Sequence, residues 1–248
     1  MRDVLVVIPA LNEEDSVGVV VKETRAALDD VDILVVNDHS TDNTAAVAAA
    51  AGADVVSNVF NLGVGGAMRV GFRYAARRGY QTMVQVDGDG QHDPREIPAL
   101  LAVLRANGEP ATEARVVIGA RWAGTGTFQV PRARRWAMRM LAAYLTRLTG
   151  TRLTDVTSGF RAYNAPAIEL FARTYPAEYL SDTVESLVIA SRSGAQVAQV
   201  PVSMRVRHAG SPSQPAWRAV GYLIRVGLML VLEVIRTRSR IPPPEEDR

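Results

Sequence analysis

Two carboxylates two residues apart follow an apolar run, and their spacing suits a divalent cation. Asp87 and Asp89 flank Gly88, which lets a ligand approach the backbone closely. An EF-hand loop would need Gly at position 6 and Glu at position 12, where this chain has His92 and Pro98, so that calcium motif is excluded. Mg²⁺ or Mn²⁺ typically takes one or two protein carboxylates together with substrate phosphates. The segment therefore predicts a Mg²⁺ or Mn²⁺ site that acts on a phosphorylated substrate.

Two further polar segments follow apolar runs that end near Pro9 and before Asp38. Asn12 can cap a helix, with the next two glutamates in its favourable first turn. Helix capping alone can account for Glu14, whereas Glu13, which follows the end of an expected strand, is also a candidate ligand contact. A carboxylate at Asp38 can accept a hydrogen bond from a nucleobase N–H or from ribose hydroxyls.

A glycine-rich segment at residues 61–67 reads Asn-Leu-Gly-Val-Gly-Gly-Ala. It lacks the Gly-Lys-Ser/Thr of a Walker loop, and it follows the third expected strand, whereas a dinucleotide fingerprint belongs in the first strand–helix turn. We expect these glycines to let a helix begin close to a bound donor.

The elements that position these residues alternate in type. Short β-branched runs separated by helical segments are typical of an open α/β sheet, whose ligands bind at the carboxyl ends of the strands. The expected strands are Val4–Ile8, which Pro9 should end, Ile33–Val36, Asp54–Ser57, Met83–Val86 and Val116–Ile118. The expected helices are Glu14–Leu28, Thr44–Ala51, Gly65–Arg78 and Arg95–Ala106.

The second half is less regular, and it is read as an elaboration of the same sheet. Helices are expected at Arg132–Leu148, Asp182–Arg192 and Trp217–Arg236. Ser158–Asn164 is either a strand or a loop, and Gln196–Val206 alternates like a strand.

Charge divides the chain into two unlike halves. The net charge is +2 over 248 residues, but residues 1–120 carry −7 and residues 121–248 carry +9. Such asymmetry predicts two different kinds of partner. The chain has no cysteine, which excludes disulfides, thiolate metal sites and cysteine nucleophiles. We find no signal-peptide core and no uncharged apolar stretch of membrane-spanning length.

The ordered set of motifs resembles glycosyltransferase family 2, with its GT-A fold, and within it the dolichol-phosphate or polyprenyl-phosphate mannosyltransferase branch. The resemblance implies an α/β, Rossmann-like, open and mostly parallel sheet with helices on both faces. The segments that carry it are residues 9–14, 36–42, 61–67, 87–92, 155–161 and 207–210.

The resemblance also implies roles for individual residues. In the first half, Pro9, Glu13 and Asp38 would hold the nucleoside of a GDP- or UDP-hexose. Asp87, Asp89 and Gln91 would hold the metal and the diphosphate.

In the second half, Arg121, Arg134 and Arg207 would bind phosphate, the first two meeting the acceptor, and Glu185 would lie near the acceptor. Departures from the branch pattern bear on this half: Met138 stands where Ser is common, and Gly-Ser-Pro-Ser at 210–213 lacks the usual Lys.

The acceptor decides what chemistry is needed. A lipid phosphate is already anionic and needs arginines to place it, which the basic second half favours. A sugar or small-molecule hydroxyl would need a general base, for which Asp182 and Glu185 are the candidates.

A long apolar helix bears on the membrane question. In Trp217–Arg236 all four charged residues fall on one narrow stripe, and arginines at 236, 238 and 240 follow. Such a helix either lies in a membrane interface or packs on protein, including a second copy of the chain or a membrane protein.

The sequence thus predicts an inverting, metal-dependent glycosyltransferase that moves a mannose- or glucose-type hexose to a polyprenyl phosphate. The alternatives are a family 2 enzyme with a hydroxyl acceptor and an inactive nucleotide-sugar-binding subunit. We expect a peripheral protein at the cytoplasmic membrane face and no nucleic-acid partner. Expected divisions are a donor half at 1–120, an acceptor half at 121–210, an amphipathic helix at 211–240 and a flexible tail at 241–248.

Overall fold

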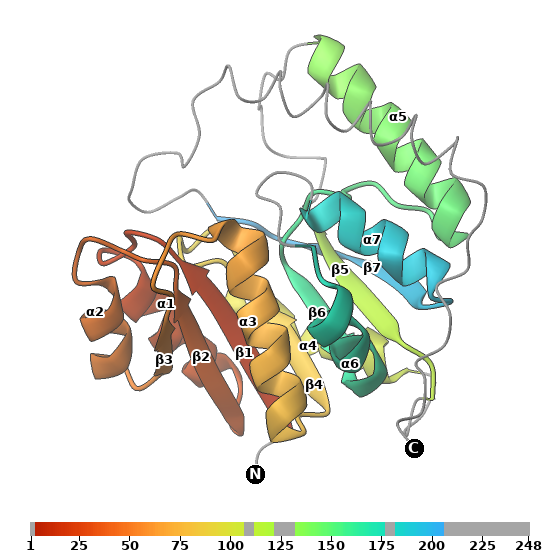
Figure 1. Ribbon diagram of the computed structural model, residues 1–248. Helices are drawn as coiled ribbons and strands as arrows, with labels where there is room; N and C mark the ends of the chain where they lie inside the picture. Colours follow the sequence, from red (N-terminus) through yellow and green to blue (C-terminus); the bar gives the residue numbers. More distant parts are fainter. Residues whose placement is uncertain (1–2, 107–111, 122–131, 177–181, 206–248) are drawn as a thin grey trace.

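A seven-stranded sheet with the order β3-β2-β1-β4-β6-β5-β7 forms the centre of the molecule (Figure 1). The computed structural model describes residues 3–106, 112–121, 132–176 and 182–205, and for residues 121 and 132–138 it describes the backbone alone. The strands are β1 (Val4–Ala10), β2 (Val31–Asn37), β3 (Asp54–Ser57), β4 (Thr82–Gln85), β5 (Arg115–Arg121), β6 (Arg161–Asn164) and β7 (Gln196–Val202).

Most neighbouring strands run parallel, as predicted. The pairs β1–β2, β1–β4, β2–β3 and β5–β7 are parallel, whereas β6 runs antiparallel to both of its neighbours, β4 and β5. The segment 158–164, which the sequence left as strand or loop, therefore supplies the strand that joins the two halves of the sheet.

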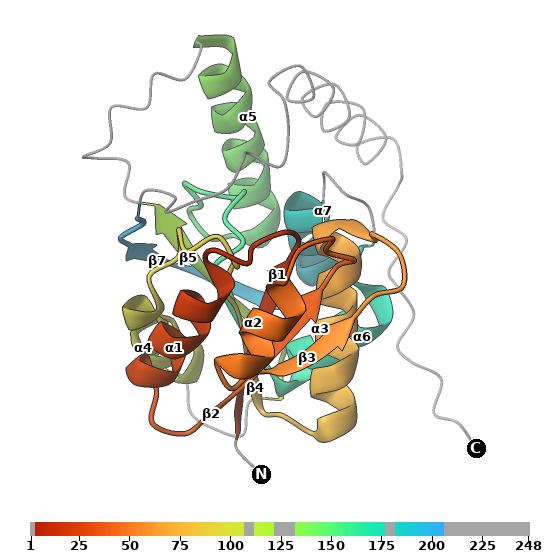
Figure 2. The ribbon, with the colours of Figure 1, turned by 90° about the vertical axis from the view of Figure 1, so that its left-hand side faces the viewer.

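Helices cover both faces of the sheet, which confirms the predicted α/β architecture (Figure 2). Side chains of α1, α2 and α4 pack on one face, and those of α3, α5, α6 and α7 pack on the other. The helices are α1 (Val17–Ala27), α2 (Thr44–Ala50), α3 (Gly63–Arg78), α4 (Ile97–Arg105), α5 (Arg132–Thr149), α6 (Ala165–Thr174) and α7 (Asp182–Arg192), with a short 3₁₀ turn η1 (Pro94–Glu96).

Alternate residues of β1 enter the two cores. Leu5 and Val7 belong to the core beneath α3, and Val6 and Ile8 belong to the core beneath α1. Successive strand side chains point to opposite faces, so a strand covered on both sides is apolar at every position. This burial explains why the sequence identified the first-half strands from their continuous apolar runs.

Pro9 does not end β1, contrary to the sequence expectation. The strand continues to Ala10, and Pro9 pairs with Val36 of β2. The pairing of β1 with β4 stops at Val7, so β1 has only β2 beside it at Pro9. A missing backbone N–H is tolerated where the strand is an edge on one side.

Helix α6 was not predicted, although the sequence contains its start signal. The side chain of Asn164 is the N-cap and accepts a hydrogen bond from the N–H of Ala167 at 3.2 Å, and Pro166 lies in the first turn. An Asn cap followed by Pro is a typical helix start.

Two other sequence expectations concern the C-terminal part. The strand expected at Gln196–Val206 ends at Val202, and the helix expected at Trp217–Arg236 lies outside the described residues. The proposed divisions of the chain stay predictions. None of the helices in the described ranges is long and apolar enough to cross a membrane.

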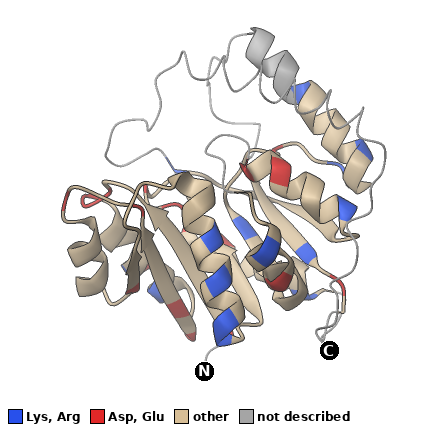
Figure 3. Cartoon of the chain, in the orientation of Figure 1, with Lys and Arg blue, Asp and Glu red and all other residues tan. Residues whose placement is uncertain are grey.

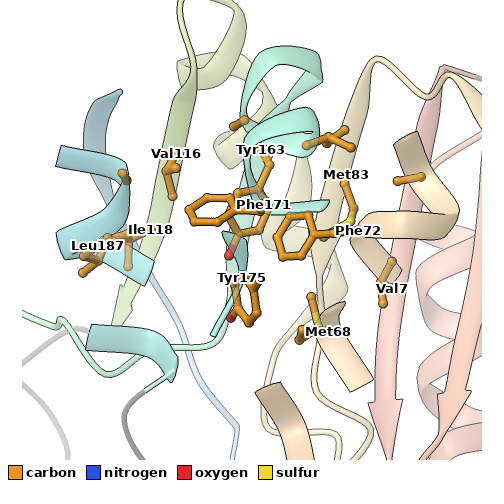
Figure 4. Close-up of a cluster of buried hydrophobic side chains, with 14 of the residues drawn as sticks. Val7, Met68, Phe72, Met83, Val116, Ile118, Tyr163, Phe171, Tyr175 and Leu187 are labelled. Atoms are coloured by element: carbon orange, nitrogen blue, oxygen red, sulfur yellow. The ribbon is translucent and has the colours of Figure 1, made fainter. Parts of the chain in front are cut away.

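We predict that Phe72→Ala destabilises the fold strongly. Phe72 is fully buried, and its ring contacts the rings of Tyr163, Phe171 and Tyr175 with centroids 4.8–5.2 Å apart (Figure 4). Removing a buried Phe ring typically costs about 3–5 kcal/mol. The matched control is Phe60→Ala, because the Phe60 side chain is 72% exposed. Urea unfolding should show a change within about 0.5 kcal/mol for the control, and equal losses in both variants would contradict this core.

Candidate donor and metal site

Three loops meet where β1, β2 and β4 end, because β1 lies between the other two strands in the sheet. Pro9 lies near the end of β1, and the loops carry Glu13, Asp38, Asp87 and Asp89, so the structure brings the predicted donor-side residues to one edge. In Figure 3 several of the acidic segments lie in loops along this edge of the first half.

The loops after β1 and β2 are bonded directly to each other. The N–H of Asn12 donates to Oγ of Ser40 at 2.9 Å, and the N–H of Thr41 donates to Oδ1 of Asn12 at 2.8 Å. Asn12 adopts the left-handed conformation, with φ 54. Helix α1 begins only at Val17, with Ser16 at its N-cap, so the expectation that Asn12 caps this helix is wrong.

Glu14 is likewise outside the first turn of α1. Its Oε2 accepts a hydrogen bond from the N–H of Asn43 at 2.9 Å, and its own N–H donates to Oδ2 of Asp42 at 3.2 Å. Asp42 also accepts from the N–H of Thr44 at 3.0 Å, at the start of α2. The side chain of Glu14 therefore fastens the second loop and not its own helix.

Pro9 and Glu13 lie beside the loop from Asp87 to His92, which we call the metal loop because it carries the candidate metal ligands. Oγ of Ser16 is 2.9 Å from Oε2 of Glu13 and 2.8 Å from the carbonyl oxygen of Gly88. A Cβ atom on Gly88 would lie 3.2 Å from the carbonyl oxygen of Pro9, so the two loops approach closely at this glycine. This arrangement fits a ligand that spans both loops.

Asp38 is engaged within the protein itself. Its carboxylate accepts from Nδ2 of Asn58 at 2.8 Å and from the N–H groups of Leu62 and Gly63 at 2.9 and 2.7 Å. The residue is buried, and three of the roughly four acceptor positions of a carboxylate are filled. Asp38 therefore fixes the loop before α3 and the start of that helix, and its predicted contact with the nucleoside stays a prediction.

The loop from Asp87 to His92 presents oxygen ligands to a cation. The Asp87 side chain is 38% exposed, and Oδ1 of Asp89 accepts a hydrogen bond from the N–H of Gln91 at 3.0 Å. Gln91 is exposed, so its side-chain amide can reach a ligand. Two carboxylates and an amide oxygen are a suitable donor set for Mg²⁺ or Mn²⁺.

The donor set is incomplete without a substrate. No group of three or more His, Cys, Asp or Glu side chains that could hold a metal is found within the described ranges. A Mg²⁺ site with one or two carboxylates normally takes its remaining ligands from phosphates and water. The loop therefore fits a metal that binds together with a diphosphate.

Helix α7 supplies the acidic residues of the second half. Glu185 is half-buried, and Asp182 at the start of the helix is buried. Burial raises the pKa of Asp182 to about 6; Arg161 opposes this effect, and the negative charge of Asp87 adds to it. The pKa of Asp182 is therefore affected by the same Asp87 that is predicted to bind the metal.

The predicted phosphate-binding arginines can be placed only in part. Arg121 is the last residue of β5, level with Val202 of β7, and Arg134 lies in the first turn of α5. Their side chains and the whole of Arg207 lie outside the part of the chain that is described, so their roles stay predictions.

An ionic cluster on the metal loop was missed by the sequence analysis. Arg205 donates from its backbone N–H to the carbonyl of Gln91 at 2.9 Å, and its guanidinium contacts Asp93 at 2.8 Å and Glu23 of α1 at 2.5 Å. Arg205 thus joins the end of β7, the metal loop and α1. The sequence held no signal for this cluster, because the ionic partners of Arg205 lie 112 and 182 positions away in the chain.

We predict that Asp93 makes stability depend on pH below 4. Hydrogen bonds from Arg95 and then Arg205 lower the pKa of Asp93 to about 2, against about 3.9 for an unfolded chain. The stabilisation is therefore complete above about pH 4 and is lost as the pH falls towards 2; it amounts to at most about 3 kcal/mol.

The test compares urea unfolding of the wild type and Asp93→Asn at pH 7 and pH 3. Asn keeps the capping oxygen for the N–H of Arg95 and removes the charge. The difference in free energy of unfolding between wild type and Asp93→Asn should be smaller at pH 3 than at pH 7. The exposed control Asp29→Asn should leave the free energy of unfolding unchanged at both pH values. A difference that is the same at both pH values would refute the assignment.

Known proteins resemble this chain over most of its length. The model of the family described as Glycosyl transferase family 2 matches residues 5–171. Undecaprenyl-phosphate mannosyltransferase from Micrococcus luteus is 32% identical over 247 residues, covering 95% of this chain and 98% of that protein. Polyprenol monophosphomannose synthase from Mycolicibacterium smegmatis is 32% identical over 219 residues, covering 83% and 78%.

Solved structures show the same fold. Glucosyl-3-phosphoglycerate synthase from Mycobacterium tuberculosis, crystallised with Mn²⁺, UDP and glucosyl-3-phosphoglycerate, superimposes with a TM-score of 0.70 at 25% identity and covers 98% of this chain and 81% of that one. The same enzyme was also crystallised with Mg²⁺ and UDP, with a TM-score of 0.68 at 26% identity. The family match and the two relatives agree with the sheet and loops described above: the chain belongs to glycosyltransferase family 2 and is a glycosyltransferase.

Proposed function

We propose that this glycosyltransferase moves a hexose from a nucleotide diphosphate sugar to a polyprenyl phosphate. The observation that carries the proposal is the likeness to undecaprenyl-phosphate mannosyltransferase over 95% of the chain, which extends well past residue 171, where the family match ends. Glu185, predicted to lie near the acceptor, and Arg207, predicted to bind phosphate, are in this later part. A relative from Methanococcus voltae, UDP-N-acetylglucosamine–dolichyl-phosphate N-acetylglucosaminyltransferase, is also named for a lipid-phosphate acceptor.

The donor is proposed to be a GDP- or UDP-hexose that lies across the β1 and β4 loops. Pro9 and Glu13 would line the nucleoside, and Asp38 would support it indirectly by fixing the start of α3. Asp87, Asp89 and Gln91 would hold Mg²⁺ or Mn²⁺. Support for donor and metal comes from the solved neighbours, which were crystallised with UDP or UDP-glucose and Mn²⁺.

The proposed reaction needs little proton transfer. An oxygen of the acceptor phosphate forms the new bond to the anomeric carbon, while the bond from that carbon to the leaving diphosphate breaks, which inverts the configuration. The bound metal neutralises charge on the diphosphate. Arg121, Arg134 and Arg207 would hold the two anionic phosphate groups in place by charge-assisted hydrogen bonds.

A second candidate is transfer to a hydroxyl group of a small molecule. It is favoured by two observations: the superimposable glucosyl-3-phosphoglycerate synthase, and the buried carboxyl of Asp182 with its pKa raised to about 6. A hydroxyl acceptor must lose a proton during attack, and a carboxyl with a pKa near neutrality is suited to accept it.

We propose that the enzyme works as a peripheral protein at the cytoplasmic face of the membrane, where a polyprenyl phosphate presents its head group. The basic second half, with a net charge of +9, is suited to anionic lipid.

Acceptor choice is tested by incubating the purified chain with Mn²⁺, a labelled sugar donor and either polyprenyl phosphate or 3-phosphoglycerate. The donors are GDP-mannose, UDP-glucose and UDP-N-acetylglucosamine. We expect butanol-extractable label that depends on polyprenyl phosphate. Label found only on 3-phosphoglycerate would favour the second candidate, and donor binding without any transfer would point to an inactive binding subunit.

We predict that Asp89→Asn and Asp89→Ala both lower turnover at least about a hundredfold, because a bound metal contributes several kcal/mol of charge stabilisation. Asn retains an oxygen for the N–H of Gln91, so it separates loss of charge from loss of the loop's hydrogen bond. Asp29→Asn, on the surface, is the control and should retain full turnover. Wild-type rates in Asp89→Asn would refute the metal role of this carboxylate.

A further inference from the structure

We propose that Gln85, His92 and Gly159 form a cradle that orients the carboxylate of Asp87 for metal binding. The inference rests on the proposed metal site and goes further, because none of these three residues would itself touch the ion. Each acts on a different part of Asp87: one on an oxygen of the carboxylate, one on the backbone, and one on the space around the side chain.

Gln85 approaches one oxygen of the carboxylate. It is the last residue of β4 and is buried, and its Nε2 donates to Oδ1 of Asp87 at 3.3 Å. The opposite orientation of the amide would turn its oxygen toward the carboxylate, which would be repulsive. Its Oε1 is buried with no hydrogen-bond partner within the described chain. A buried polar atom without a hydrogen-bond partner lowers the stability of the strand, and an apolar residue at position 85 would avoid that cost. An apolar residue could not donate a hydrogen bond to Asp87, which is what Gln85 supplies in return.

His92 fixes the backbone of Asp87 and faces its other oxygen. The N–H of Asp87 donates to Nδ1 of His92 at 2.9 Å, so Nδ1 is the acceptor, and the ring proton of the neutral imidazole is on Nε2. Nε2 lies 3.6 Å from Oδ2 of Asp87. The ring is buried and stacks on Phe160 with centroids 4.9 Å apart, which holds it in this orientation.

Gly159 closes the remaining side. A Cβ atom at this position would lie 2.9 Å from Nε2 of Gln85 and 3.2 and 3.3 Å from the two carboxylate oxygens of Asp87. Gly159 is not among the glycines with positive φ, so the backbone itself would accept another residue. Glycine is therefore favoured at position 159 because a larger side chain would crowd the carboxylate of Asp87.

These contacts do not bury the carboxylate. The Asp87 side chain is still 38% exposed although Gln85, His92 and Gly159 all lie close to it. Groups that orient a metal ligand typically change metal affinity by 10–100-fold when they are removed. The cradle thus accounts for how a ligand at a strand end can be oriented before the metal arrives.

The decisive variant is Gln85→Met, which keeps the length of the side chain and removes the donor. Mn²⁺ binding is measured by the EPR signal of free Mn²⁺, with Mn²⁺ alone and with Mn²⁺ plus UDP, and thermal unfolding is recorded without metal. We expect the Kd for Mn²⁺ to rise about tenfold, while the melting temperature is unchanged or higher, because the unsatisfied Oε1 is removed. A merely structural role would instead lower the melting temperature and leave the Kd unchanged.

Two further variants keep the test informative. His92→Asn places an oxygen near the position of Nδ1 and should retain most of the affinity that His92→Leu loses. Gly159→Ala should weaken Mn²⁺ binding, whereas Gly71→Ala, whose Cβ would lie 2.6 Å from Cγ1 of Val7 in the core, should cost stability and leave Mn²⁺ affinity unchanged.

Each outcome decides between the proposals. If the wild type binds Mn²⁺ and all variants bind it equally, the cradle is refuted and the proposed metal site stands. If the wild type binds no Mn²⁺ even with UDP, the metal site and the cradle are both refuted.

Discussion

The fastening of the loop that carries Asp87 and Asp89 is the constraint on which the rest of the candidate site depends. A loop can present two carboxylates to one cation only if the rest of the protein holds its backbone in place. Two residues make three such contacts: Ser16 contacts the carbonyl of Gly88, and Arg205 bonds both to the carbonyl of Gln91 and to the side chain of Asp93. The loop also follows β4, which lies beside β1 at the point where the strand order β3-β2-β1 reverses, and ligands bind at such switch points in open sheets.

Strands β1, β2 and β4 could be predicted because burial on both faces leaves a continuous apolar run, as at Val4–Ile8. Helix α6 and strand β6 could not be predicted in the same way. Strand β6 contains the charged Arg161, whose burial is possible only because carbonyl oxygens and a hydroxyl group from other segments accept its hydrogen bonds. A sequence pattern cannot show that such partners will be present.

The position of the donor-side residues could be predicted, but their contacts could not. A polar residue at a strand end can bind a ligand or another loop, and the choice depends on distant residues. Asp38 bonds to Asn58 and to the start of α3, and Asn12 bonds to Ser40 and Thr41 instead of capping a helix. Asp38, which was expected to contact the nucleoside, therefore also fastens the start of α3, and Asn12, which was expected to cap a helix, joins the loops after β1 and β2.

Arg161 connects the donor and acceptor parts of the site. Its buried guanidinium donates to the carbonyl of Ser158, beside the turn that passes under Asp87, and to Thr183 and Ser186 of α7. A shift of α7 would therefore strain the turn against the metal carboxylate, because a buried guanidinium cannot give up these acceptors without a large cost. The same positive charge lowers the pKa of Asp182 against the effect of burial. Arg161 thus links α7 to the turn beside Asp87 and offsets part of the effect of burial on Asp182. The proposed acceptor side would therefore depend in its geometry on the candidate metal loop.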